Sequence, residues 1–330
     1  MTPLLTILCI TYNHEKYIAE ALDSFICQET SFPFEVLIGD DCSTDSTVTI
    51  VKQYMQKHNN IRLLQRDKNL GVNKNFYDTA SHIKSKYVAL CEGDDYWIDS
   101  NKLQKQVDFL EKNPNVTLCF HPVNVVDEKG ELQYIYPDLH KLNNHKLNFD
   151  YLLKENFIQT NSVVYRWCFD SFKAKLENCE MLPLDHIYHL FHARQGNIAL
   201  LNDVMSVYRK NSGGVWFNIF TSNWYRKYGL LFLNYLYFMH NEFGLDNDTE
   251  IKKFQVCLVY LGCREATSNF DKLCIKFSRY CKSNLLYKIF MKVTSLISKI
   301  LPRKQKDYLR AFRGAVRSIR ALQEEHHEKY

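Results

Sequence analysis

Residues 4–13 read Leu-Leu-Thr-Ile-Leu-Cys-Ile-Thr-Tyr-Asn, an apolar run followed by the more polar Thr11, Tyr12 and Asn13. Apolar side chains at helical spacing follow between Tyr17 and Phe25, and a second apolar strand runs from Phe34 to Ile38. Further along, the patterns predict a helix around 48–55, strands at 61–65 and 87–91, and a helix around 103–110. Beyond these, they predict strands at 116–120, 158–165 and 198–208, a helix around 185–194, and a hairpin turn at Asp127–Gly130. Strands and helices in this order predict an α/β fold with a mostly parallel sheet flanked by helices.

Three of these predicted strands end in polar clusters. Thr11-Tyr12-Asn13 follows the first, Asp40-Asp-Cys-Ser-Thr-Asp45 the second, and Glu92-Gly93-Asp94-Asp95 the strand at 87–91. Because parallel strands bring their carboxyl ends to one edge, we expect the clusters to meet there. Each cluster alone could be a helix cap or an exposed turn, but six acidic residues together need a cation among them. Carboxylate oxygens suit Mg²⁺ or Mn²⁺.

Two common phosphate-binding patterns are missing from the sequence. No G-x-G-x-x-G follows the first strand, and no G-x-x-x-x-G-K-[ST] occurs anywhere. The sequence therefore offers no backbone cradle for phosphates, and a diphosphate would need a metal ion held by carboxylates.

Four motifs in order resemble the glycosyltransferase family 2 proteins of bacterial polysaccharide and lipopolysaccharide synthesis. They are Thr6-Ile-Leu-Cys-Ile-Thr-Tyr-Asn13, Asp40-Asp-Cys-Ser-Thr-Asp-Ser-Thr47, Asn69-Leu-Gly71 with Asn75, and Glu92-Gly-Asp-Asp-Tyr-Trp97. The resemblance is specific over residues 4–115 and looser over 116–215. It implies the Rossmann-like GT-A fold, a nucleotide-diphosphate sugar as donor, and inversion at the anomeric carbon.

The resemblance also implies roles for residues of the donor site. Asp41, with Asp40 beside it, matches the position that binds the nucleobase, and Thr11, Tyr12 and Asn13 match the floor of the nucleotide pocket. Glu92, Gly93 and Asp94 match the D-x-D motif, with Glu in place of the first aspartate. Asp94 is then the expected metal ligand, assisted by Glu92.

Other positions carry further expectations from the resemblance. Asp185, at the start of a predicted helix, matches the general base that activates the acceptor hydroxyl; an N-cap role is the alternative. Lys74 and Arg209 match groups that reach the donor phosphates, although a solvated lysine and a structural ion pair explain them equally well.

The acceptor side is expected to include four residues, which are Asp95, Trp97, Asn161 and His186. His186, His189 and His192 lie on one side of the helix, but without an H-E-x-x-H pattern zinc is disfavoured.

Composition indicates the compartment. The eleven cysteines, Cys281 included, contain no C-x-x-C pair, which is typical of reduced thiols. The N-terminal residues lack the pattern of a signal peptide, and no apolar run reaches about 18 residues. We therefore expect a cytoplasmic protein, peripheral on the inner face of the plasma membrane.

The tail differs from the body in charge. Residues 271–330 hold 15 Lys and Arg against 5 Asp and Glu. Apolar stripes run from Leu286 to Ile300 and from Leu309 to Ile319, each beside basic residues. An anionic membrane surface is the favoured partner, with packing against the catalytic domain or a partner subunit as the alternative. Nucleic acid is disfavoured because the acidic site would repel a polyanion.

Together these patterns predict a GT-A catalytic domain over residues 1–218, with a nucleotide-sugar-binding half at 1–115 and an acceptor-side half at 116–218. Residues 219–330 form a helical basic region. The expected activity is metal-dependent transfer of a sugar to a lipid-linked or oligosaccharide acceptor. The expected donor is a UDP-linked sugar. A sugar-nucleotide-forming nucleotidyltransferase and a catalytically inactive binding protein are the alternatives, and a homo-oligomer stays open.

Overall fold

The computed structural model describes residues 2–263, 269–280 and 284–327. Its contacts divide the chain into two compact units. The first holds residues 1–180 and 184–214, and the second holds 181–183 and 215–330. Cys281 lies outside the described residues, whereas the ten described cysteines are free thiols.

A seven-stranded sheet forms the centre of the first unit, in the order β10-β6-β9-β4-β1-β2-β3. The strands are β1 (Leu5–Thr11), β2 (Phe34–Asp40), β3 (Ile61–Gln65), β4 (Tyr87–Leu90), β6 (Val116–Phe120), β9 (Val164–Arg166) and β10 (Asn197–Leu200). All neighbouring strands are parallel except β9, which runs antiparallel to both β4 and β6. The predicted mostly parallel α/β sheet is therefore confirmed.

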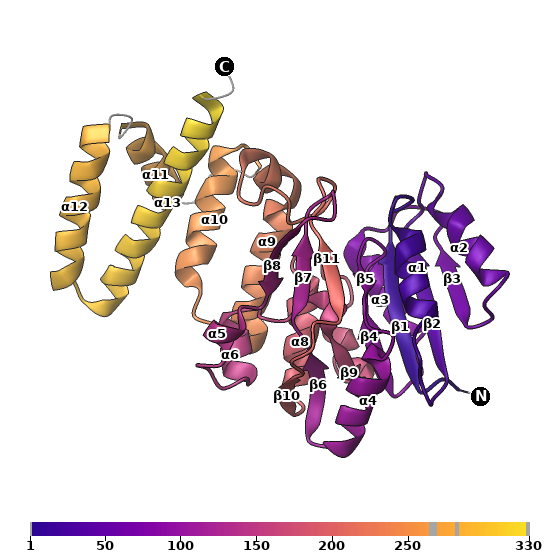
Figure 1. The fold of residues 1–330 in the computed structure, drawn as a ribbon. Helices are drawn as coiled ribbons and strands as arrows, with labels where there is room; N and C mark the ends of the chain where they lie inside the picture. The colour runs from indigo at the N-terminus through magenta and orange to yellow at the C-terminus, as the bar shows by residue number, and fades with distance from the viewer. Residues whose placement is uncertain (1, 264–268, 281–283, 328–330) are drawn as a thin grey trace. The chain divides into compact units, whose positions relative to one another are not determined.

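Alternation along β1 explains how the sheet is covered. Leu5, Ile7 and Cys9 join one apolar core, together with residues of α1 (Ile18–Ile26), α2 (Thr47–Met55) and α4 (Lys102–Lys112). Figure 1 shows α1 over β1 and β2. The other face receives α3 (Val72–Ser81), which contacts β1 and β2. Each fully buried Leu or Ile side chain contributes about 1.5–3 kcal/mol.

A second sheet of the same unit has the order β5-β11-β7-β8. Its strands are β5 (Tyr96–Trp97), β7 (Val123–Val126), β8 (Leu132–Tyr136) and β11 (Ser206–Arg209). β7 and β8 form the hairpin that the turn at Asp127–Gly130 predicts. Shorter helices complete the unit, namely α5 (Leu139–Leu142), α6 (Phe149–Lys154), α7 (Lys173–Leu176), α8 (Leu184–Ala193) and 3₁₀ turns at Thr160–Ser162 and Phe169–Ser171.

Two sequence-based strand predictions are wrong in part. The predicted strand from Ile158 to Tyr165 begins only at Val164, because the buried Asn161 sits in a 3₁₀ turn and bonds to other segments. The predicted strand at 198–208 is two strands in different sheets, β10 and β11, separated by the exposed Asn202 and Asp203.

The second unit is helical in its described part. Its helices are α9 (Ser222–Phe243), α10 (Asp248–Tyr260), α11 (Asn269–Tyr280), α12 (Asn284–Ile300) and α13 (Arg303–His327). The Thr221 side chain caps α9 by accepting a hydrogen bond from the Trp224 N–H, and Gly244, with φ of 70°, ends it. Phe312, Val316 and Ile319 of α13 are buried within this unit, where α13 packs on α10 and α11.

Candidate functional site

The three polar clusters meet at one edge of the large sheet. β1 pairs with β2 on one side and β4 on the other, and Thr11 lies opposite Asp40 in the ladder. Beyond the strands, the Asp41 N–H donates to the Thr11 carbonyl at 3.0 Å, and the Gly93 N–H donates to the Ile10 carbonyl at 3.1 Å. The predicted convergence is confirmed.

The carboxylates that follow β2 shape the neighbouring loops. Asp40 accepts hydrogen bonds from the backbone N–H and the hydroxyl of Ser43. Asp41, also buried, accepts from the backbone N–H groups of Leu70 at 2.6 Å and Gly71 at 2.9 Å. Asp41 therefore holds the turn that leads into α3, and its contact with a nucleobase stays a prediction.

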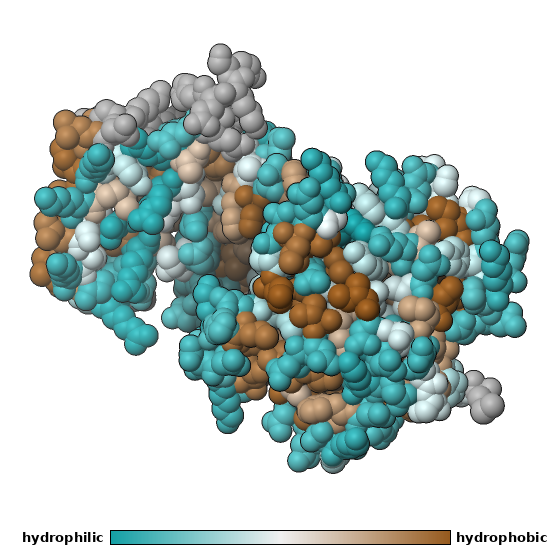
Figure 2. All heavy atoms as spheres, in the orientation of Figure 1, coloured by the Kyte–Doolittle hydropathy of each residue, from teal (hydrophilic) through white to brown (hydrophobic). Residues whose placement is uncertain are grey.

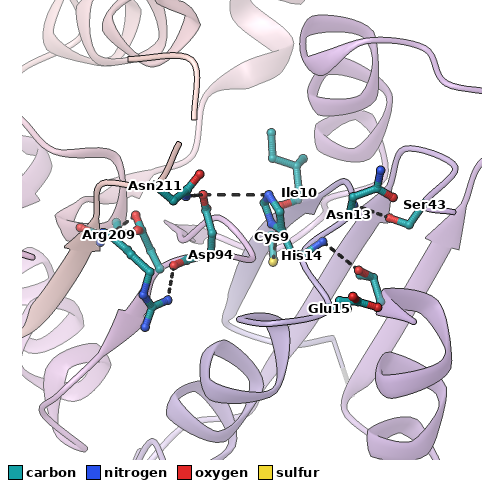
Figure 3. Close-up of polar contacts among 12 residues, drawn as sticks. Cys9, Ile10, Asn13, His14, Glu15, Ser43, Asp94, Arg209 and Asn211 are labelled. Atoms are coloured by element: carbon teal, nitrogen blue, oxygen red, sulfur yellow. Dashed lines mark hydrogen bonds and ion pairs between the residues drawn. The ribbon is translucent and has the colours of Figure 1, made fainter. Parts of the chain in front are cut away.

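The segment after β1 is tied to the segment after β2. Asn13 adopts the left-handed region with φ of 56°, and its Oδ1 accepts from the Thr44 N–H at 2.8 Å. Its own N–H donates to the Ser43 hydroxyl at 2.9 Å (Figure 3). Tyr12 stays 44% exposed at the same edge. The loop is thus fixed while the Tyr12 ring remains open to a ligand.

Asp94 lies between residues from two distant parts of the chain (Figure 3). The Asn211 side-chain amide donates to Asp94 Oδ2 at 2.9 Å, and His14 Nε2 lies 4.0 Å from the same oxygen. The Arg209 guanidinium donates to the Asp94 carbonyl at 2.6 Å. Sequence reasoning missed Asn211 and His14; their only signals are their places just after β11 and just after β1.

Because Gly93 has no side chain, Thr11 and His14 can pack closely against its backbone. A Cβ at position 93 would lie 2.9 Å from Thr11 Oγ1 and 2.9 Å from His14 Nδ1. Both of these polar atoms are buried and have no hydrogen-bond partner. Burying a polar atom without a partner costs about 1–3 kcal/mol, and a bound ion or water would supply the missing partner.

Acidic groups are concentrated beside these atoms. Burial, then the charges of Asp94 and Asp185, raise the pKa of Glu92 to about 8. Burial, followed by the charges of Asp94 and Glu92, also raises the pKa of Asp95 well above its usual range. A cation at this edge would relieve the part of these shifts that comes from the neighbouring carboxylates.

The residues present fit a divalent ion that is held partly by protein carboxylates and partly by a bound substrate. In the described residues no group of three His, Cys, Asp or Glu side chains could enclose a metal. Magnesium-type sites commonly use one or two carboxylates, with substrate phosphates and water as the other ligands. Asp94 and Glu92 can supply those carboxylates, and the unpartnered Thr11 Oγ1 and His14 Nδ1 lie close to Gly93 between them.

Asp185 stands in the first turn of α8, largely buried, with its carboxylate held in place. Asn156 Nδ2 donates to Asp185 Oδ2 at 3.2 Å and Thr160 Oγ1 donates to it at 3.3 Å. His189 Nε2 lies 3.9 Å away, and the Tyr165 hydroxyl contacts the other ring nitrogen at 2.6 Å. Burial raises the pKa of Asp185, although the hydrogen bonds oppose this. The group is prepared to take up a proton.

The two predicted phosphate-binding cations have protein partners here. The Arg209 guanidinium donates to Glu20 Oε2 at 2.6 Å and lies 4.8 Å from the ring centre of Tyr17. Lys74, on α3, forms an exposed ion pair with Glu180 at 3.1 Å. Contact of either with a donor stays a prediction, and each would first have to leave its present partner.

The four residues expected on the acceptor side are mostly interior. Asp95 Oδ2 accepts from the Asn161 amide at 3.0 Å, and Asp95 Oδ1 accepts from the Arg209 N–H at 2.9 Å. Trp97 packs in the core and donates to the Asn161 carbonyl at 2.9 Å. His186 contacts the Leu152 carbonyl at 2.7 Å, and burial lowers its pKa to about 4. These side chains hold the scaffold behind the site, so we assign them no contact with an acceptor.

This sheet topology and site edge are those of the GT-A class, and comparisons with known proteins agree. Residues 6–175 match the family described as Glycosyl transferase family 2, so the chain belongs to glycosyltransferase family 2. An uncharacterized protein of Mycobacterium tuberculosis is 44% identical over 220 residues, which cover 66% of this chain and 62% of that protein. The poly(ribitol-phosphate) beta-N-acetylglucosaminyltransferase TarS of Staphylococcus aureus is 36% identical over 107 residues, 31% of this chain and 18% of TarS.

Solved structures show the same fold. TarS residues 1–349 match with a TM-score of 0.56 and 19% identity, covering all of this chain and 92% of that one. A mannosyltransferase from Pyrobaculum calidifontis, in complex with GDP-Man and Mn²⁺, matches with a TM-score of 0.53 and 14% identity, covering 98% and 88%. Within the described ranges, no helix has both the length and the apolar character needed to cross a bilayer.

Proposed function

We propose that this protein is an inverting, metal-dependent glycosyltransferase. In this proposal it moves a sugar from a nucleotide-diphosphate donor to a lipid-linked or oligosaccharide acceptor in cell-surface polysaccharide synthesis. One observation carries the proposal: buried, unpartnered Thr11 Oγ1 and His14 Nδ1 adjoin Gly93, between Asp94 and Glu92, a carboxyl group whose pKa is raised by burial and then by the charges of Asp94 and Asp185.

A UDP-linked sugar is the proposed donor. TarS has been solved in complex with UDP-GlcNAc, and it shares this fold. The archaeal mannosyltransferase was solved with GDP-Man and Mn²⁺, so GDP is the nucleotide to test against UDP. The residues that would meet the base are Asp41 and the exposed Tyr12, which lie at the ends of β2 and β1.

The proposed mechanism gives separate roles to three carboxylates. Asp94 and Glu92 would hold the divalent ion, which when bound neutralises the charge that develops on the departing diphosphate. Asn211 keeps Asp94 Oδ2 oriented by its hydrogen bond. Asp185 Oδ2, positioned by Asn156 and Thr160, accepts the proton of the acceptor hydroxyl as that oxygen attacks.

Thermal shift and nucleotide release test the proposal together. We expect UDP with Mn²⁺ to raise the unfolding temperature more than UDP alone or GDP with Mn²⁺, because a ligand that binds the folded state stabilises it. Asp94→Ala should remove that stabilisation and abolish UDP release from UDP-sugars. The control is Asp203→Ala, which removes an exposed carboxylate paired with Lys105. Retained metal-dependent binding and turnover in Asp94→Ala would show that the site is assigned wrongly.

A further inference from the structure

Helix α12 presents a row of apolar side chains to solvent. Seven aliphatic residues are between 41% and 82% exposed, and we call them the α12 stripe: Leu285, Leu286, Ile289, Val293, Leu296, Ile297 and Ile300. Their spacing of three and four residues sets them along one face of the helix. Soluble surfaces seldom leave a contiguous apolar patch of this kind without an interaction to cover it.

The opposite face of α12 already packs within its own unit. The Phe290 ring lies 5.3 Å from that of Phe277 and 5.7 Å from that of Phe312. The Arg320 guanidinium lies 4.2 Å from the ring centre of Tyr287. The helix is therefore held by α11 and α13, and the α12 stripe is its outward face.

Figure 1 shows α12 as the outermost helix of this unit, packed against α13, and Figure 2 shows brown hydrophobic residues along its outer edge. The α13 stripe behaves differently, because Phe312, Val316 and Ile319 are buried. The sequence-based expectation that both stripes lie on a membrane is therefore wrong for α13.

Charge on α12 identifies the kind of partner. Lys288, Lys292 and Lys299 are exposed and lie together on one flank of the stripe, and α12 contains no Asp or Glu. Two copies of this chain joined through their stripes would bring lysine rows together with no acid on α12 to pair with them. An anionic bilayer offers acyl chains to the stripe and negative headgroups to the lysines.

From these contacts we infer that α12 docks in the plane of an anionic lipid surface. Its 17 residues span about 25 Å, and the three lysines on its flank exclude a spanning orientation. This docking does not depend on sugar transfer. If the proposed function also holds, docking would bring the enzyme to the surface where a lipid-linked acceptor resides.

Vesicle co-sedimentation of the full chain tests the inference. We expect binding to vesicles of phosphatidylcholine mixed with phosphatidylglycerol, weak binding to phosphatidylcholine alone, and loss of binding as salt rises. Replacing Lys288, Lys292 and Lys299 by Gln should weaken binding by about fivefold per lysine. Matched replacement of the exposed Lys57, Lys129 and Lys154 should leave it unchanged. Equal binding to both vesicle types would overturn the inference.

A second variant tests the stripe itself. Replacing Ile289, Leu296 and Ile300 by Gln should weaken vesicle binding by more than about tenfold per side chain. The control replaces Leu132, Tyr134 and Ile135, which are exposed apolar residues of β8, by Gln. Failure of the wild-type chain to bind vesicles, together with a dimer that the α12 variant converts to a monomer, would assign the stripe to self-association instead. UDP binding measured in the same samples keeps this outcome separate from the donor-site proposal.

Discussion

Asp94 and Asp185 have identical side chains, but the two carboxyl groups lie in different surroundings. Asp94 is held through Asn211 and adjoins His14 at the end of β4. Asp185 is largely buried at the start of α8, where burial raises its pKa. A carboxyl group with a raised pKa binds a proton more tightly, which suits a general base. The surroundings therefore separate the proposed metal ligand from the proposed base.

Replacement of Asp185 by Asn should separate its catalytic role from a structural one. The amide cannot take up the proton, so we expect turnover to fall by about 10²–10⁴ while UDP binding, measured by calorimetry, stays unchanged. In the wild type, kcat/KM should fall as pH drops through the raised pKa of Asp185, at a higher pH than an ordinary aspartate would give. A parallel loss of UDP affinity in Asp185→Asn would instead indicate a helix cap or scaffold role.

A buried lysine gives a pH test of stability. Lys102 lies 4.1 Å from the ring centre of Trp97 and donates to Gln106 Oε1 at 2.9 Å, and burial lowers its pKa to about 7. The unfolded chain protonates this lysine up to about pH 10.4. Between these pH values the unfolded state therefore holds more protons, and the free energy of unfolding rises with pH.

We therefore expect Lys102→Met to be more stable than the wild type at pH 7, by a gap on the order of a few kcal/mol that closes as pH approaches 10. Urea denaturation of both proteins across this range measures the gap. The comparison cancels the contributions of other titrating groups. A gap that stays constant with pH would mean that Lys102 remains charged in the folded state.

At the residue scale the sequence predicted the acids of the site better than their partners. Asp40, Asp41, Glu92 and Asp94 stand at strand ends, so their place on one edge follows from strand order. The contact between Asn211 and Asp94 joins residues 117 positions apart, and no local pattern encodes it. Trp97 was expected on the acceptor side, yet its buried ring packs against Phe25 in the core.

At the scale of elements, the Asp95 side chain joins the loop after β4 to β11 and to the turn that holds Asn161. Asp95 accepts hydrogen bonds from the Arg209 N–H and the Asn161 amide, and it is 1% exposed. This tie positions Arg209 and Asn211, which both contact Asp94. The register of β11 and the position of Asp94 therefore depend on each other.

Asp95→Ala should remove both of these hydrogen bonds. Two buried donors lose their acceptor, so we expect the free energy of unfolding to fall by about 2–4 kcal/mol. Asp95→Asn should also destabilise the fold, because its amide nitrogen would face one of the two donors. Asp108→Ala, at an exposed position of α4, should change stability by less than about 0.5 kcal/mol. Calorimetric unfolding checks all three, and an unchanged Asp95→Ala protein would contradict the tie.

Elements were predictable where apolar periodicity is strong. β1, β2 and α1 follow directly from their buried residues, whereas α3 reads Val-Asn-Lys-Asn-Phe-Tyr-Asp-Thr-Ala-Ser and was missed. Its buried Asn75 donates to the Gly39 carbonyl at 2.8 Å, so polar residues form part of its packed face. A search for apolar residues at helical spacing cannot detect a helix whose buried face is partly polar and held by hydrogen bonds.

At the scale of the whole molecule, the candidate site and the α12 stripe belong to different units. Every residue of the site, from Thr11 to Asn211, lies in the first unit, and α9 to α13 lie in the second. The sequence predicted basic amphipathic helices in the tail. It could not tell which apolar stripe is buried, because α12 and α13 have similar patterns and only their packing distinguishes them.

This division predicts that damage to the helical unit spares the donor site. Val316 is fully buried in α13, and an Asp at that position would place a charge in an apolar core at a cost of several kcal/mol. For Val316→Asp we expect loss of helical circular dichroism and of vesicle binding, with UDP affinity retained. Arg317→Asp, at the next and exposed position, should keep its helical content. Loss of UDP affinity in Val316→Asp alone would show that the donor site requires an intact helical unit.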